Sequence, residues 1–187
     1  MSKIVFILGV SGSGKGTIIQ ELLKTQQLKY CPSYSTRPMR PGEINGDRYR
    51  FISDDEFHKA IDNDEFIEYA TYSGHLYGTK KDIIQNIEGD KTPIKELELD
   101  GFSKIIESHQ MDNKFISIFL DIPDEIMIQR ITSRAPISPE DLKRRLERAH
   151  EEREKAKKLC NKIVFTDLSL KENVERVKST LYEELNN

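Results

Sequence analysis

Residues 4–17 read Ile-Val-Phe-Ile-Leu-Gly-Val-Ser-Gly-Ser-Gly-Lys-Gly-Thr, and this stretch decides the fold. Its first five residues are apolar without alternation, which predicts a strand buried on both faces of a parallel sheet. The glycines end that strand, and apolar residues recur at helical spacing from Ile18 to Leu23. The stretch therefore predicts a strand, a loop and a helix in succession, the opening unit of an α/β fold.

The loop between this strand and helix has the composition of a phosphate-binding loop. Its backbone N–H groups converge on phosphate oxygens, the helix N-terminus adds positive charge, and Lys15 reaches the β and γ phosphates. An ordinary glycine-rich turn is the alternative, but the strand, the spacing, the lysine and the helix together favour nucleotide binding. We expect the phosphates to be bound by Gly9, Ser11, Gly12, Ser13, Gly14, Lys15, Gly16 and Thr17.

One position in the loop departs from the usual pattern G-x-x-x-x-G-K-S/T, whose final hydroxyl helps to hold Mg²⁺. Here Gly16 follows Lys15, and Thr17 comes one place later. The ending Gly-Lys-Gly-Thr is similar to that of adenylate kinases, so nucleotide binding remains the expectation. The protein ligand of the metal stays open, and switching of the GTPase type is disfavoured.

The composition predicts one globular fold. The 187 residues are 36% hydrophobic and 33% charged, with 29 Lys+Arg against 32 Asp+Glu and a net charge of −3. This near balance disfavours extended disorder and a general nucleic-acid binder, which carries a basic excess. The longest apolar run falls far short of the ~20 residues of a membrane span, and the N-terminus lacks the pattern of a secretory signal. We expect a cytoplasmic protein without membrane or nucleic-acid partners. The two cysteines, Cys31 and Cys160, form no C-x-x-C pair and give no support for a zinc site.

Residues 33 to about 90 differ in character from the opening unit, and we expect them to form an inserted lobe. Prolines, glycines and arginines between residues 33 and 51 predict turns and short antiparallel strands. Ser53 and Glu56 form a capping box at the start of a helix. Residues 65–73 alternate as a strand, and residues 79–87 predict another helix.

The parallel core resumes after the lobe. We expect a strand at 94–99, a helix at 101–109, a strand at 115–122, a helix from 123–125, an arginine-bearing helix from 138 to 159, a strand at 163–165 and a final helix capped by Ser169 and Glu172. The charge that dominates residues 142–159 predicts a largely solvated face.

A second motif lies in the lobe, between Ser33 and Tyr49. Arg37 and Arg40, fixed by a proline-containing turn and joined by hydroxyl donors, can clamp a phosphate monoester. The segment resembles guanylate kinases, which carry T-R-x-x-R-x-G-E-x-x-G-x-x-Y after their phosphate loop. The match falls on Thr36, Arg37, Arg40, Gly42, Glu43, Gly46 and Tyr49, and continues through residues 65–70 and 73–79.

This resemblance implies how an acceptor nucleotide would be bound. The phosphate of GMP would be held by Ser33, Arg37, Arg40, Tyr49 and Tyr77, and the guanine would be recognised by Glu68 and Thr79. Guanine offers N1–H and N2–H donors that one ionised carboxylate accepts together, and adenine cannot make that pair. Taken singly, an arginine pair in a loop is ordinary surface charge, Glu68 is an ordinary strand residue, and the tyrosines are packing residues.

A third region, Glu96-Leu97-Glu98-Leu99-Asp100-Gly101, ends a predicted core strand. Period-two geometry places Glu96 and Glu98 on one face, where acids point into a cleft at the carboxyl edge of the sheet. In the family this segment reads acid, apolar, Asp, apolar, Gln, Gly. Aligned on Gly101, Glu98 replaces the Asp that supports guanine, Asp100 replaces the Gln, and Lys95 occupies an apolar position. Glu96 would bind Mg²⁺ through water, the alternative being a charged strand edge.

Three arginines match the family's lid. Arg130 and Arg134 match its first two lid arginines, and Arg145 matches the third, with Arg144 as the alternative register. Cations that close over a transferring phosphoryl group stabilise the charge on its equatorial oxygens and exclude water. Ala135 and Pro136 replace the usual Gly-Thr after the second arginine, which leaves the flexibility of the lid open.

The resemblance implies a fold and a reaction for the whole chain. The fold is an α/β P-loop parallel sheet flanked by helices, with an inserted mixed α+β lobe for the nucleoside monophosphate and a helical lid. One domain would span residues 1–187, with a core at 1–32 and 91–187, a GMP lobe at 33–90 and a lid at about 130–148. The reaction would be ATP + GMP ⇌ ADP + GDP with Mg²⁺, in a monomer or small homo-oligomer. Phosphorylation of another small acceptor and a catalytically silent interaction domain are the alternatives.

Overall fold

The computed structural model describes residues 3–25, 27–72, 74–82, 91–109 and 115–186, and these contain two sheets. A five-stranded sheet has the order β2-β7-β1-β8-β9, and a four-stranded sheet has the order β4-β3-β6-β5. The first sheet is parallel and the second is mixed. The α/β fold class expected from the sequence, with a parallel sheet and a second mixed sheet, is confirmed.

The elements have the following bounds. The five-stranded sheet consists of β1 (Ile4–Gly9), β2 (Leu28–Tyr30), β7 (Thr92–Glu96), β8 (Phe115–Asp121) and β9 (Lys162–Phe165). The four-stranded sheet consists of β3 (Ser33–Ser35), β4 (Tyr49–Phe51), β5 (Phe66–Tyr72) and β6 (His75–Lys80). The helices are α1 (Lys15–Leu23), α2 (Asp54–Asp62), α4 (Leu99–Glu107), α5 (Asp124–Thr132), α6 (Pro139–Leu159) and α7 (Leu170–Asn186).

The chain divides into two compact units. The first comprises Met1–Ile4, Gln26–Lys95 and Asp100–Lys114, and the second comprises Val5–Thr25, Glu96–Leu99 and Phe115–Asn187. The predicted GMP lobe lies within the first unit, and the phosphate loop and the predicted lid lie within the second. The division into core, lobe and lid stays a prediction.

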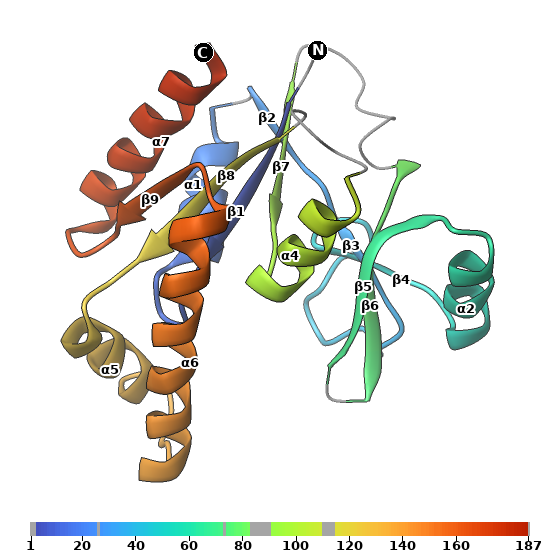
Figure 1. Cartoon of the computed structure of the whole chain (residues 1–187). Helices are drawn as coiled ribbons and strands as arrows, with labels where there is room; N and C mark the ends of the chain where they lie inside the picture. Colours follow the sequence, from blue (N-terminus) through green and yellow to red (C-terminus); the bar gives the residue numbers. More distant parts are fainter. Residues whose placement is uncertain (1–2, 26, 73, 83–90, 110–114, 187) are drawn as a thin grey trace. The chain divides into compact units, whose positions relative to one another are not determined.

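The core of the second unit forms around two buried strands. β1 is apolar throughout, β8 is apolar except for Ser117 and Asp121, and both strands are almost wholly buried, as a parallel core predicts. Helix α7 packs beside α1 and against β8 and β9 (Figure 1), and it contributes Val177 and Leu181 to the core. Helix α6 is a single 21-residue helix that begins at the Ser138 N-cap. None of the helices among the described residues is long and apolar enough to span a bilayer.

The four-stranded sheet in the first unit carries an aromatic core on one face. The rings of Phe57 on α2 and Phe66 on β5 stack 4.3 Å apart, and Tyr34 meets Phe66 edge-on at 6.3 Å. The predicted capping box fixes α2, because Ser53 Oγ accepts from the Glu56 N–H and the Glu56 side chain accepts from the Ser53 N–H. The stacked rings place α2 on one face of this sheet, and the residues of the opposite face point away from α2.

A bulge in β5 separates these two faces. Phe66 pairs with Lys80, and Glu68 pairs with Thr79, so two steps along β5 correspond to one along β6. Because strand residues two apart otherwise share a face, the extra residue Ile67 turns Phe66 toward α2 and Glu68 toward the opposite face.

Three element predictions from the sequence are wrong. Thr79 does not begin a helix but lies in β6, because Gly74 turns the chain and antiparallel pairing with β5 continues to Lys80. Residues 83–87 of that predicted helix lie outside the described residues. β3 and β4 pair in parallel rather than antiparallel, since the 13 residues between Ser35 and Tyr49 let the chain cross back.

The third error concerns the strand predicted at 94–99. β7 ends at Glu96 and α4 begins at Leu99, so Glu96 and Glu98 do not share a strand face. The alternation in Glu-Leu-Glu-Leu misled the prediction, because Leu99 belongs to the buried stripe of α4 with Phe102 and Ile105 at helical spacing. The short strand β2 was not predicted at all.

Candidate functional site

The loop between β1 and α1 is shaped by contacts to its carbonyl groups. Gly14, the N-cap of α1, has φ 87°, a conformation that favours glycine, and it caps the helix without a side chain. Thr166 Oγ1 donates to the Ser13 carbonyl at 2.8 Å. Because the C=O and the next N–H of a trans peptide point in opposite directions, this bond aims the Gly14 N–H away from Thr166.

Two cations also contact loop carbonyls. Lys15 Nζ donates to the Gly9 carbonyl at 2.6 Å and to the Val10 carbonyl at 3.4 Å. Arg130 Nη1 donates to the Gly12 carbonyl at 3.0 Å, and its Nη2 donates to the Thr166 carbonyl at 2.9 Å. Arg130 therefore ties the loop to the end of β9, in addition to any role as a lid arginine.

The hydroxyl groups of the loop differ in their surroundings. Ser13 is 1% exposed, and within the described residues its Oγ has no hydrogen-bond partner. A buried hydroxyl without a partner is costly, so Ser13 Oγ is suited to a polar ligand atom. Thr17 is exposed on α1, and Gly16 has no hydroxyl to offer a metal.

The arginines at the start of α6 have different partners. Arg145 Nη1 lies 3.4 Å from Ser11 Oγ, at the outer limit for a hydrogen bond from the arginine to the phosphate loop. Arg144 Nη2 instead donates to Asp141 Oδ1 at 2.7 Å. This geometry favours Arg145 over Arg144 as the third lid residue. Arg134 is exposed just beyond the end of α5.

Two residues near the loop were missed in the sequence. Arg148 donates from Nε to Glu152 Oε1 at 2.8 Å and from Nη2 to Glu98 Oε2 at 3.4 Å. Burial raises the pKa of the Glu152 carboxyl. The positive charges of Arg148 and Lys15 oppose this rise, and the negative charge of Glu98 adds to it. The i,i+4 spacing of Arg148 and Glu152, one turn after Arg145, was the available signal. Glu98, predicted to support guanine, belongs to the second unit and contacts Arg148 there.

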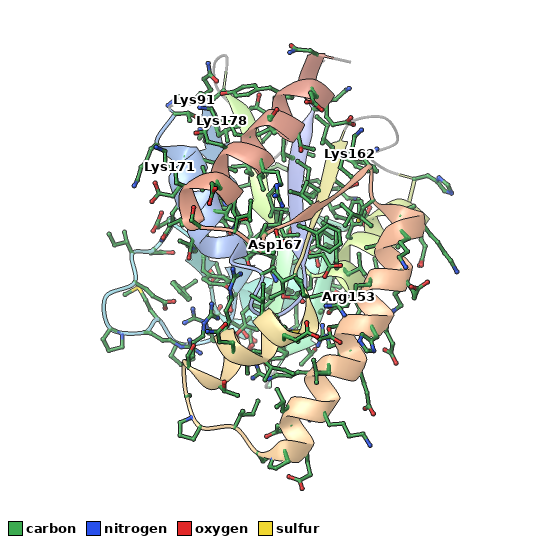
Figure 2. All side chains as sticks on the ribbon, turned by 90° about the vertical axis from the view of Figure 1, so that its left-hand side faces the viewer. Lys91, Arg153, Lys162, Asp167, Lys171 and Lys178 are labelled. Carbon is green, nitrogen blue, oxygen red and sulfur yellow. The ribbon has the colours of Figure 1, made fainter. Side chains whose placement is uncertain are left out.

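The base of α6 is anchored to the end of β8. Arg153 donates to Asp121 Oδ1 at 2.8 Å, to Asp124 Oδ1 at 2.7 Å and to the Ile122 carbonyl at 2.7 Å, and Figure 2 shows this arginine on α6. His150 adds a 2.8 Å contact to Asp124. Burial works against ionisation of Asp124, but the bonds from His150 and Arg153 outweigh it and lower its pKa.

In the first unit, the expected acceptor residues share one face of the four-stranded sheet. Ser33 pairs with Tyr49, Ser35 with Tyr77, and Glu68 with Thr79, and residues paired across strands point to the same side. The rings of Tyr49 and Tyr77 meet edge-on with centroids 6.0 Å apart. Thr79 Oγ1 donates to Glu68 Oε1 at 2.6 Å, and both residues are buried. This face lies opposite the aromatic core under α2.

Arg37 is fixed over this face. Its guanidinium lies 4.9 Å from the centroid of the Tyr49 ring, and it donates to both oxygens of Glu43 at 2.7 and 2.5 Å. The Arg37 hydrogen bonds, with the Arg40 N–H at 2.7 Å, lower the pKa of Glu43 to about 2. Glu43 therefore remains ionised and orients Arg37. The side chain of Arg40 is exposed.

Glu96, the predicted metal contact, is half-buried at the end of β7. Among the described residues there is no group of three or more His, Cys, Asp or Glu that could hold an ion. Mg²⁺ usually keeps several waters and binds through one or two carboxylates and substrate phosphates, and the Glu96 carboxylate has the chemistry of such a ligand.

Comparison with known proteins decides the family. The family model described as guanylate kinase matches residues 1–184. The chain belongs to the guanylate kinase family. The recognition made from the arginine motif is thereby confirmed, and the chain is a P-loop kinase of nucleoside monophosphates.

Individual relatives agree with this assignment. A guanylate kinase from Nostoc sp. is 38% identical over 168 residues, which cover 88% of this chain and 83% of that protein. One from Mycoplasma capricolum is 41% identical over 151 residues, which cover 79% of this chain but 50% of that protein. The crystal structure of guanylate kinase from Anaplasma phagocytophilum superimposes on this chain with a TM-score of 0.70 at 22% sequence identity. The match covers 98% of this chain and 86% of that chain, and it supports the fold.

Proposed function

We propose that this chain transfers the γ-phosphoryl group of ATP to GMP, giving ADP and GDP. The observation that carries the proposal is the buried Glu68 carboxylate, held by Thr79 on the sheet face that also bears Tyr49 and Tyr77. Family membership supplies the class of reaction, and this carboxylate supplies the reason for guanine.

Glu68 would recognise the base through hydrogen bonds. It accepts one hydrogen bond from Thr79, and an ionised carboxylate has about four acceptor positions. The remaining positions suit the N1–H and N2–H donors of guanine. Adenine has an acceptor at N1, so the same carboxylate would face a lone pair and lose affinity.

The phosphate of GMP would be bound by Ser33, Arg37, Arg40, Tyr49 and Tyr77. Arg37 is pre-oriented by Glu43 and by the Tyr49 ring, so little side-chain entropy is lost when the anion binds. Arg40 is exposed and its side chain would be recruited by the phosphate.

ATP would be bound by the phosphate loop, from Gly9 to Thr17. The Gly14 N–H, the start of α1 and Lys15 would contact its phosphates, and the Ser13 hydroxyl would gain a partner. Arg130, Arg134 and Arg145 would neutralise the migrating phosphoryl group, and closure over it would exclude water.

Magnesium would accompany ATP. Glu96 would contact it through water, and the metal would neutralise charge on the phosphate oxygens. Gly16 leaves the loop without the usual metal-binding hydroxyl, so the chain's own contribution to the metal would be small.

An acceptor screen with γ-labelled ATP and Mg²⁺ tests the proposal. We expect label on GDP, with GMP preferred over AMP, dGMP and water. A well-folded protein that labels AMP as fast as GMP would indicate a kinase for another acceptor. No ATP binding in calorimetry would indicate a silent interaction domain.

A further inference from the structure

Lys95 is a fully buried lysine outside the residues so far assigned. It lies next to the end of β7, and its side chain is 0% exposed. A buried ammonium group is costly unless polar atoms surround it. Packing alone does not account for a charge at this buried position.

The ammonium group of Lys95 contacts the segment that leads into β3. Its Nζ donates to Ser33 Oγ at 2.7 Å and lies 3.3 Å from the Cys31 carbonyl. Pairing of β2 with β7 fixes this approach, because Tyr30 is opposite Ile94 and the Cys31 N–H donates to the Ile94 carbonyl at 2.9 Å. The contact to Ser33 is thus built into the backbone pairing.

This contact determines what the Ser33 hydroxyl can do. An ammonium group has only donors, so Ser33 Oγ must accept from Lys95. The hydroxyl proton then points elsewhere and is available as a donor, on the sheet face shared with Tyr49. A hydroxyl that accepts from a cation is polarised and binds an anion more strongly.

We propose that Lys95 is a positioning residue for the phosphate of the acceptor nucleotide. It holds the Ser33 hydroxyl as a donor to that phosphate, and its charge acts through this hydrogen bond. The proposal rests on the function proposed above, in which Ser33 contacts the phosphate of GMP.

The test compares Lys95→Met with Ser33→Ala and with the double variant. We expect each single change to raise the KM for GMP by about 10- to 100-fold, the loss of one charge-assisted hydrogen bond. The double variant should be no worse than the more damaged single variant, because both changes remove the same interaction. The KM for ATP should stay within about threefold of the original value.

Guanosine, which lacks the phosphate, separates positioning from folding. Its inhibition constant should be the same for the original protein and Lys95→Met. Equal weakening of guanosine and GMP would mean that Lys95 only supports the fold, and would overturn the proposal. An unchanged KM for GMP, or effects that add in the double variant, would overturn it as well.

Two further variants complete the design. Lys95→Gln keeps an N–H donor without the charge, and it replaces Lys95→Met in the comparison if that variant does not fold. The KM of Lys95→Gln for GMP should rise less than the KM of Ser33→Ala. Lys104→Met is the control, since this exposed lysine of the same unit donates to the Tyr69 carbonyl at 3.0 Å and should leave the KM unchanged. Absence of GMP turnover by the original protein refutes the proposed function, whereas turnover that ignores Lys95→Met refutes only this inference.

Discussion

At the scale of single residues, the Glu68 carboxylate would separate guanine from other bases. Glu68→Gln replaces one acceptor oxygen by an NH₂ donor, which faces the donors of guanine. We expect kcat/KM for GMP to fall by about 100-fold, since two bonds to a charged acceptor are weakened, with the KM for ATP unchanged. Steady-state kinetics provide the measurement.

Glu65→Gln is the matched control for this change. Glu65 is an exposed carboxylate three residues away that pairs with Lys80, so its loss removes the same charge without touching the base. Equal GMP kinetics for Glu68→Gln and Glu65→Gln would contradict base recognition by Glu68.

The adjacent arginines of α6 offer a second paired comparison. Arg145 approaches Ser11 of the phosphate loop, and Arg144 pairs with Asp141. We expect Arg145→Met to lower kcat by about 100- to 1,000-fold, as for loss of a group that stabilises transition-state charge, and Arg144→Met to lower it less than about threefold. The reverse ranking in single-turnover assays would place the lid register one residue earlier.

The Arg37–Glu43 pair predicts a dependence on acid. The pKa of Glu43 falls from an ordinary 4.5 to about 2 in the folded chain, because of the bonds from Arg37 and the Arg40 N–H. A depressed carboxyl pKa stabilises the fold above the unfolded value, and that contribution is lost as the pH falls from 4.5 to about 2.

NMR titration of the Glu43 carboxyl carbon checks this value directly, and melting curves of Glu43→Gln and the original protein should converge as the pH decreases through the same range. A Glu43 midpoint near 4.5 would show that the pair does not form in solution.

Much of the candidate site could be predicted at this scale, because the loop glycines, Arg37, Glu68 and Arg145 carry recognisable chemistry at fixed spacing. The hydrogen bonds that these residues make could not be predicted from the sequence. Lys95 was noted only for its apolar position, and Glu152 was passed over, because a single lysine in a strand and one acid in a charged helix carry no sequence signal of their contacts.

At the scale of elements, the bulge in β5 gives the four-stranded sheet its two different faces. It requires close approach of β5 and β6 at Gly78, where an added Cβ would lie 2.8 Å from two Phe66 ring carbons and 3.0 Å from the Glu68 carbonyl. Gly78 is therefore constrained by its neighbours on both sides of the bulge.

We expect Gly78→Ala to destabilise the protein by about 1–3 kcal/mol through overpacking. It should also raise the KM for GMP, since the backbone of Glu68 must shift. Urea unfolding checks the first effect. Gly46→Ala is the comparison, because nothing lies within 4 Å of its added Cβ and only its φ of 93° opposes the change. Unaltered stability of Gly78→Ala would mean that the strands are farther apart than described.

Elements with strongly apolar sequence or clear caps, such as β1, β8 and α2, could be predicted because local signals alone determine them. The pairing of β3 with β4 could not, since strand direction depends on the path of a loop rather than on the strand residues. The end of β7 was misplaced because Leu97 and Leu99 are both buried, one beside the strand and the other in α4.

At the scale of the whole molecule, the two compact units separate the expected donor residues from all the expected acceptor residues except Glu98. The phosphate loop and the lid arginines belong to one unit, and Ser33, Arg37 and Glu68 belong to the other. Ligand binding to the folded state slows the opening reactions of the region that it stabilises.

Hydrogen exchange with each ligand alone therefore checks this division. GMP should protect β3, β5 and β6, and ATP with Mg²⁺ should protect residues 9–17 and the first half of α6. Guanosine serves as the control, because it should protect β5 and β6 without protecting the segment around Arg37. Protection of the same peptides by GMP and ATP would contradict separate sites.

The anchored base of α6 has a mechanical consequence. The first residue of the helix lies 14 positions before Arg153, so this part of α6 measures about 20 Å at 1.5 Å per residue. Pivoting by about 15° at the anchor would carry the tip through about 5 Å, one helical turn of displacement. If α6 closes as the predicted lid, a small rotation at the Arg153 anchor would therefore become a large displacement of its first turn.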